Sequence, residues 1–175
     1  MANRDNPHGL IPVGRTLSGG EPRVKQFSKD SSGGNIFIHD VVNREADGNI
    51  TAGGTPGTTT YTGVSLNYSA TGAAGTHLVV VSPDAMFVAQ DNADTDGIAA
   101  ADLGLNCNFE FNAGSADSKI SGHELDESSA DTTNTLDAKL HELWNSPNNE
   151  HSANADIVIT INKHRLAQGT GIAGV

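Results

Sequence analysis

The chain has 175 residues, with 21 Asp and Glu against 10 Lys and Arg, and a net charge of −11. Such a charge argues against sequence-independent binding of nucleic acid, which depends on clustered Lys and Arg. No apolar run approaches the ~20 residues of a membrane-spanning helix, so no membrane partner is expected. The N-terminus lacks the apolar segment of a signal peptide, and the single cysteine, Cys107, cannot form an intrachain disulfide. Synthesis in a reducing cytoplasm is therefore expected.

The charge is unevenly distributed along the chain. Residues 1–44 have a net charge of +2, whereas residues 45–175 have −13. One interpretation is that this uneven distribution of charge reflects chance together with the need for solubility. The other is that a basic N-terminal segment and an acidic body contact different surfaces.

Residues 1–34 are expected to form an extended N-terminal arm. Three prolines and six glycines interrupt any regular element there, and the apolar residues are scattered. A segment of this kind buries too little to fold alone. It is therefore disordered, or it packs on its own body or on a neighbour.

Residues 35–166 are expected to form a body of short strands separated by turns. Apolar, β-branched runs at 35–42, 77–82, 86–90 and 157–161 predict four of them. In residues 61–68 the even-numbered side chains are the more apolar and are expected to face the core. The alternation of Leu105, Cys107, Phe109 and Phe111 predicts a half-buried strand with Cys107 inside.

The remaining segments are loops, turns and one ambiguous element. Residues 51–60 and 69–76 are predicted to be loops, and 98–103 a helical turn or two. Apolar residues at 136, 140, 143 and 144 follow the period of a helix. The tail, 167–175, is expected to be flexible. Together these features predict a mainly β protein, a small antiparallel β-barrel or sandwich.

A search for catalytic and metal-binding patterns gives little. Asn92, Asp94, Asp96 and Gly97 match the start of a calcium-binding EF-hand loop, but Leu103 stands where a bidentate Glu is required. The seven histidines lack metal-ligand spacing, and Cys107 is interpreted as a core residue. We therefore expect no enzyme activity, no catalytic residue, no metal and no cofactor. A small metalloenzyme remains the least favoured alternative.

Four segments together resemble a family of capsid decoration proteins, also called cement or head-stabilising proteins, of tailed bacteriophages. They are the opening residues 1–13, the strand and acidic turn at 87–106, the Ser-Gly-x-x-Leu-Asp motif at 121–126 with its Thr-rich continuation, and the closing segment 147–164. Their order and spacing agree with the family over most of the chain. Residues 45–76 depart from it. The segment of the family that corresponds to 136–144 often resembles a strand, which favours a strand there.

The resemblance implies a virion structural protein without catalytic chemistry. Such a protein binds the outer capsid surface at junctions between capsomers and stabilises the shell against the pressure of packaged DNA. Its implied partners are the major capsid protein and copies of itself, with a trimer favoured over a dimer. The candidate capsid contacts in the arm are Arg4, Leu10, Ile11, Val13, Arg15, Leu17, Arg23, Lys25 and Phe27. The alternative is a virion-surface adhesion module that binds host glycans through the loops at 51–60 and 69–76, with Tyr61 and Tyr68 as aromatic platforms.

Overall fold

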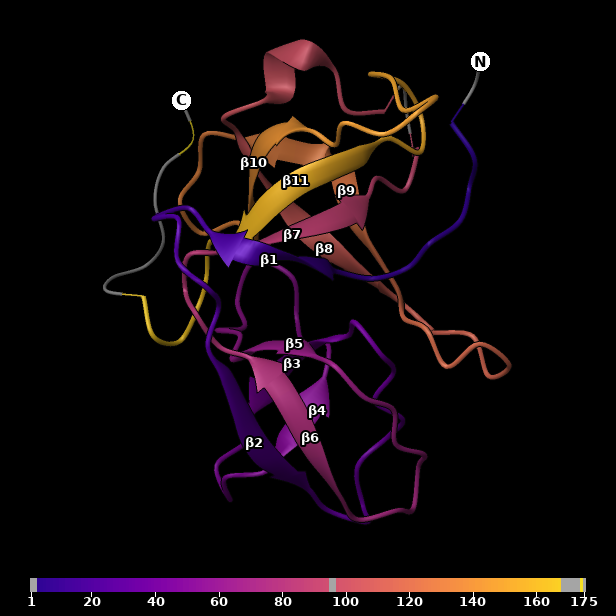
Figure 1. Ribbon diagram of the computed structural model, residues 1–175, viewed down its shortest axis with the longest axis vertical. Helices are drawn as coiled ribbons and strands as arrows, with labels where there is room; N and C mark the ends of the chain where they lie inside the picture. The colour runs from indigo at the N-terminus through magenta and orange to yellow at the C-terminus, as the bar shows by residue number, and fades with distance from the viewer. Residues whose placement is uncertain (1–2, 95–96, 168–173, 175) are drawn as a thin grey trace.

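The computed structural model describes residues 3–94, 97–167 and 174. In this part of the chain, eleven strands and one short 3-10 helix, η1 (Ala100–Asp102), are arranged as two antiparallel sheets (Figure 1). The prediction of a mainly β protein is confirmed. The arrangement is consistent with a β-sandwich, and neither sheet of the described residues closes into a barrel.

The larger sheet has six strands, and the N-terminal strand lies at one edge. Their spatial order is β1 (Ile11–Thr16), β7 (Ala85–Gln90), β11 (Asp156–Ile161), β10 (Ala138–Leu143), β8 (Asn106–Asn112) and β9 (Gly122–Asp131). Strand β7 is buried along its whole length because it lies between β1 and β11 and both of its faces are covered.

The smaller sheet has five strands, and again a strand from the N-terminal region lies at an edge. Their order is β2 (Val24–Lys29), β6 (Gly75–Val80), β5 (Gly63–Ser65), β3 (Val41–Arg44) and β4 (Ile50–Ala52). Figure 1 shows this sheet below the larger one along the long axis of the molecule.

One main hydrophobic core connects the two sheets. It combines Val41, Val64 and Val80 of the smaller sheet with apolar side chains of the larger sheet such as Phe87 and Phe109. A second cluster around Val79 fills the other face of the smaller sheet, and a third, around Val88, lies on the other face of the larger sheet. The few apolar residues of the chain are thus distributed over three clusters.

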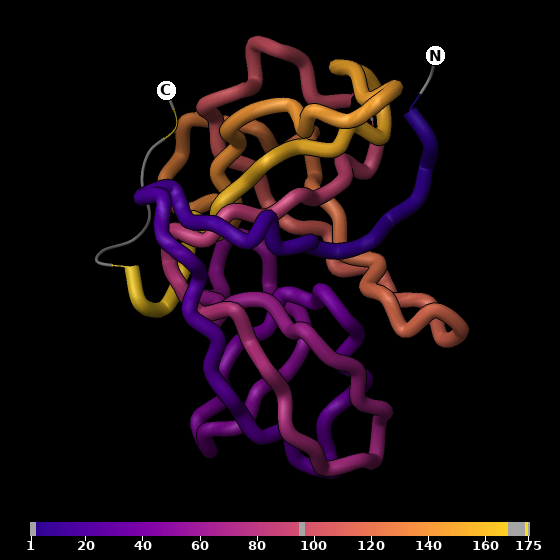
Figure 2. Tube along the Cα trace, viewed as in Figure 1, coloured from indigo at the N-terminus to yellow at the C-terminus, as the bar shows by residue number. Residues whose placement is uncertain are grey.

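The expected N-terminal arm is not confirmed, because residues 3–34 pack on the body of the same chain. Figure 2 shows this segment passing along the larger sheet, turning, and then running along the smaller sheet. Strand β1 pairs with β7, and β2 pairs with β6 over its whole length. Leu10, directly before β1, is completely buried in the main core. By pairing with the edges of the two sheets, the segment forms backbone hydrogen bonds that it cannot form alone.

The strand at 136–144 is confirmed, and its helical period has a structural cause. Ala138 and Leu140 point into the main core, as alternate residues of a strand do. A bulge between Leu140 and Glu142 then shifts the register against β11. Leu143 therefore returns to the core three residues after Leu140, and this spacing imitates a helix.

The prediction that the even-numbered side chains of residues 61–68 face the core needs correction at Tyr61. This odd-numbered residue is completely buried, with its ring 5.5 Å from that of Phe109. The longest strand, β9, lies in a stretch that shows no strand pattern. Its inward side chains include His123 and Glu127, so polar groups replace the apolar alternation that would have indicated a strand.

The loops agree with the sequence in part. Residues 98–103 contain η1, and most of 53–60 is exposed loop, although 50–52 form β4. The predicted flexible tail lies outside the described residues except for Ala167 and Gly174.

Candidate functional site

Strand β2 forms an exposed edge to which separate parts of the chain bring cationic and apolar side chains. It pairs with β6 on one side only, so its other side presents unpaired backbone groups. Exposed strand edges of this kind can pair with other chains. We call the edge and the side chains around it the β2 edge surface, whose members are Arg23, Val24, Lys25, Arg44, Leu78, Arg165 and Leu166.

Three of the five large hydrophobic side chains that are exposed among the described residues belong to this surface: Val24, Leu78 and Leu166. Val24 belongs to β2, and Leu78 lies opposite Gln26 on β6. Because successive residues of a strand face opposite sides, Val24 and Leu78 lie on the face of the sheet opposite to Lys25. Leu166 is 50% exposed and lines the groove described next, so it adds apolar area to that groove.

A basic groove lies on the same edge. It has a volume of about 180 Å³, and Lys25, Arg44, Arg165 and Leu166 are among its lining residues. Arg23 is next to it, because its carbonyl accepts a hydrogen bond from the amide of Val81 at the groove. Within the described residues, none of these four cations forms an ion pair with a carboxylate. In a chain with a net charge of −11, this groove is a local reversal of charge that suits an anionic partner.

The nine predicted contact residues fall into three groups. Arg15, Leu17, Arg23 and Lys25 are exposed, and of these Arg23 and Lys25 belong to the β2 edge surface. Leu10 is completely buried, Val13 packs on the cluster around Val88, and Phe27 packs on the cluster around Val79. Arg4 and Ile11 lie elsewhere, beside two other cavities. Leu10 therefore has no surface with which to contact a partner.

Sequence reasoning missed Arg44, Arg165, Leu78 and Leu166. Arg44 ends β3 and Arg165 follows β11, so about 120 residues separate two side chains of one groove. No local pattern could have joined them. In the sequence, only the positive charge of Arg44 and Arg165 within an acidic chain is visible. Charge alone does not indicate where a side chain lies in the fold.

A buried serine, histidine and carboxylate meet at the junction of the two sheets. Nε2 of His123 lies 3.4 Å from Oδ1 of Asp40, and Nδ1 accepts a hydrogen bond of 3.2 Å from the amide of Val41. The hydroxyl of Ser121 accepts from the backbone amide of His123. A nucleophilic serine needs a hydrogen bond from its hydroxyl group to a free ring nitrogen of a histidine. Both ring nitrogens of His123 already face other partners. Burial lowers the pKa of His123 to about 3 and raises that of Asp40 to about 6. This cluster connects residues 37–41 to β9.

Two further carboxylates are buried in the body. Asp91 lies beside Glu127 and accepts hydrogen bonds from the amides of Ala93 and Ala155. Asp137 accepts from the amides of Gly57 and Phe109. Burial raises the pKa of Asp91 and of Asp137 to about 6. Their hydrogen bonds connect segments far apart in the sequence.

The residues that the sequence offers for metal binding or thiol chemistry do not form a site. Cys107 is completely buried, and burial raises the pKa of its thiol, which is the environment of an unreactive cysteine. Part of the calcium-like turn at 91–97 lies outside the described residues. Elsewhere in the described chain, one group of three acidic side chains could approach an ion: Asp30, Glu45 and Asp47, of which the last two are exposed. Acidic groups of this kind are common on surfaces without a metal.

Tyr61 and Tyr68 do not provide the aromatic platforms expected for glycan binding by the loops at 51–60 and 69–76. Tyr61 is completely buried. The ring of Tyr68 lies 5.5 Å from that of Phe37 and also carries the ammonium group of Lys119 over one face. Trp144 is a half-buried aromatic side chain that lines a cavity elsewhere in the molecule.

The buried ionisable groups predict opposite dependences of stability on pH. The pKa of Asp91 is raised, so between about pH 4 and pH 6 its carboxyl group is protonated to a greater extent in the folded state than in the unfolded state. The contribution of Asp91 to the free energy of unfolding therefore falls as the pH rises through this range. Burial lowers the pKa of His164 to about 4, so the contribution of His164 grows between about pH 4 and pH 6.5. We expect Asp91→Asn to gain ~1–2 kcal/mol relative to the wild type from pH 4 to pH 7, and His164→Gln to lose a similar amount. Urea unfolding at each pH measures both, and parallel curves for all three proteins would contradict the assignment.

No family model matches the chain, and no curated protein matches it. No helix in the described residues is long and apolar enough to cross a membrane.

Proposed function

We propose that this chain is a structural protein of a tailed-phage virion that decorates the outer surface of the capsid. In this role it binds the major capsid protein at junctions between capsomers and stabilises the shell against internal DNA pressure. The observation that carries the proposal is the β2 edge surface, where a basic groove without carboxylate partners and the exposed side chain of Leu166 adjoin an edge strand. The four-segment resemblance to capsid decoration proteins supports it independently.

The chemistry of the surface suits a partner that is both acidic and partly apolar. Burying exposed Leu and Val side chains supplies ~25 cal/mol per Å² of apolar area. The cations of the groove select the orientation and increase the rate of association. Each copy needs to add only a few kcal/mol, because many copies act together on one shell.

Self-association belongs to the same proposal, with a trimer favoured over a dimer. In this proposal the side chains of the β2 edge surface make the contact with the capsid protein, because β4 lies close to β2 and limits the pairing of another strand there. Lys25 on this edge limits uncontrolled pairing between copies, because a charged side chain on an edge strand opposes aggregation.

A single charge reversal tests the proposal. Purified protein is added to capsids of the parent virus that lack it, and binding is measured by co-sedimentation and by electron microscopy of the particles. We expect Lys25→Glu to weaken binding by about tenfold or more, because it places a negative charge against an acidic partner and changes the groove. A capsid-bound copy should also show β2 against the shell.

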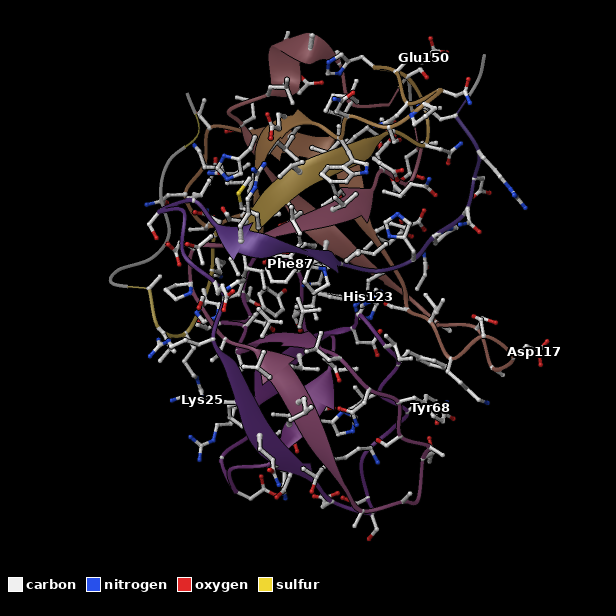
Figure 3. The ribbon with its side chains drawn as sticks, viewed as in Figure 1. Lys25, Tyr68, Phe87, Asp117, His123 and Glu150 are labelled. Atoms are coloured by element: carbon white, nitrogen blue, oxygen red, sulfur yellow. The ribbon has the colours of Figure 1, made fainter. Side chains whose placement is uncertain are left out.

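The matched control is Lys119→Glu, which reverses one lysine on another part of the molecule. Lys119 is two residues from Asp117, which Figure 3 places on the opposite side from Lys25. The control should bind as the wild type does. Full affinity of Lys25→Glu, or equal losses in both variants, would contradict docking through the β2 edge surface. Failure of the wild type to bind expanded capsids would contradict the capsid role itself.

A further inference from the structure

Two adjoining cavities lie at the end of the larger sheet where the N-terminal residues meet the loop after β10. The first, of about 310 Å³, is lined mainly by polar side chains, and the second, of about 370 Å³, mainly by apolar ones. His8 and Asp156 line both and therefore join them. Nε2 of His8 lies 3.1 Å from Oδ1 of Asp156. Cavities of this size lie at the lower end of the range for small-molecule sites, ~300–1,000 Å³.

The walls of the first cavity are held in place by buried amide groups. The side chain of Gln90 donates to the carbonyls of Arg4 and Asn154 and accepts from the amide of Asn6. The side chain of Asn149 donates to the carbonyls of Trp144 and Asp156. These bonds fix the positions of the segments that surround the cavity, so the site is largely formed before any ligand binds.

Other polar groups of the same cavity have no partner within the described chain. Asn6, Asn148 and Asn154 line it, and none of their side-chain amides makes a hydrogen bond to a described residue. The guanidinium group of Arg4 also lines it and makes no ion pair there. Three free amides and one free guanidinium group thus surround a preformed hollow.

The second cavity adds an aromatic wall. Trp144 is half-buried, with one part packed on the cluster of Met86, Val88 and Val158 and another part lining the cavity. This packing fixes the indole ring in place, because the cluster beneath it is almost completely buried. The indole group of Trp144 therefore lies next to the polar cavity, across His8 and Asp156.

We propose that these two cavities form a carbohydrate-binding site. A sugar hydroxyl both donates and accepts hydrogen bonds, and a side-chain amide offers both functions from one group. The apolar C–H face of a sugar ring packs on an aromatic face such as that of Trp144. Asn6, Asn148 and Asn154 bind hydroxyl groups, and Arg4 provides a place for a carboxylate or phosphate substituent. The ligand is an oligosaccharide of which one or two rings occupy the site.

This site is separate from the β2 edge surface and does not depend on the capsid proposal. Figure 3 shows Glu150, which borders this end of the molecule, at the opposite end from Lys25. The first described residues of the chain also lie at this end (Figure 1). A copy that docks through β2 would keep the cavities accessible, so both contacts can exist on one particle.

The chain supplies its own reporter, since Trp144 is the only tryptophan. The full-length protein is titrated with hexoses, N-acetylhexosamines, deoxyhexoses, hexuronic acids and their disaccharides, and Trp144 emission is followed. The same sugars are presented on a glycan array. We expect a saturable change with at least one class and array binding by the same class. Addition of EDTA should leave binding unchanged, because the site uses no metal.

Two variants locate the binding. Asn6→Ala with Asn148→Gly removes two free amides, and glycine at 148 accepts the backbone φ of 67° found there. We expect this double variant to bind about tenfold more weakly. Asn145→Ala is the matched control, because Asn145 is adjacent to Trp144 but does not line either cavity. No saturable change and no array binding with any sugar would overturn the proposal, as would equal affinities of the double variant and the wild type.

Discussion

Gly63→Ala is expected to destabilise the protein by about 3 kcal/mol or more, or to prevent its folding. Gly63 has a φ of 148°, and a Cβ atom built on it would lie 1.8 Å from the carbonyl oxygen of Val80. That oxygen belongs to the neighbouring strand β6, so relief requires β5 and β6 to separate. Overpacking of a buried site costs ~1–3 kcal/mol, and an unfavourable backbone conformation costs ~1–3 kcal/mol more.

Urea unfolding followed by circular dichroism measures this effect, and Gly34→Ala is the matched control. No atom lies within 4 Å of a Cβ added at Gly34, and its φ is not in the left-handed region. The control should unfold at nearly the wild-type urea concentration. If Gly63→Ala were as stable as the control, the pairing of β5 with β6 described above would be wrong.

Asp137→Ala is expected to destabilise the protein by about 3 kcal/mol and to release the loop around Gly57. The carboxylate of Asp137 is completely buried and accepts the amide hydrogens of Gly57 and Phe109 at 3.0–3.2 Å. Alanine leaves both amides without an acceptor, and each unsatisfied buried group costs ~1–3 kcal/mol. Asp137→Asn keeps one acceptor oxygen and nearly the same shape, so its loss of stability should be smaller.

Hydrogen exchange separates the local effect from the global one. The amide of Gly57 should exchange faster in Asp137→Ala than in Asp137→Asn, while amides of β7 should change only with overall stability. Equal protection of Gly57 in both variants would show that the carboxylate does not hold this loop. An alanine variant that is more stable than the asparagine variant would contradict the role of the hydrogen bonds.

The buried polar network explains why a chain with so few apolar residues can fold. Lys29 is almost completely buried and donates to the carbonyls of Asp30, Ala70 and Ala73. Asp137, Asp91 and the pair of Asp40 and His123 make comparable connections between loops and strands. Each buried group is supported by backbone hydrogen bonds, which offset part of the cost of its desolvation.

The amino-acid sequence alone was sufficient to predict the β class and most of the strands. Cys107 and Phe109 alternate with polar neighbours, and β-branched runs mark β6, β7 and β11, because a strand places successive side chains on opposite faces. The sequence also identified Arg23 and Lys25 as candidate contacts from the charge imbalance of the first 44 residues.

The positions of those residues, and the identity of the residues beside them, became known only from the three-dimensional structure. Residues 3–34 look too poor in apolar side chains to fold alone, yet they complete the edges of both sheets, because pairing with β7 and β6 supplies bonds that no local pattern encodes. Arg165 reaches the groove of Lys25 through the path of the chain after β11. Asn6 and Trp144 likewise come to adjoining cavities from opposite ends of the sequence. Periodicity reports which way a side chain faces within one element, whereas a binding surface depends on contacts between elements that are distant along the chain.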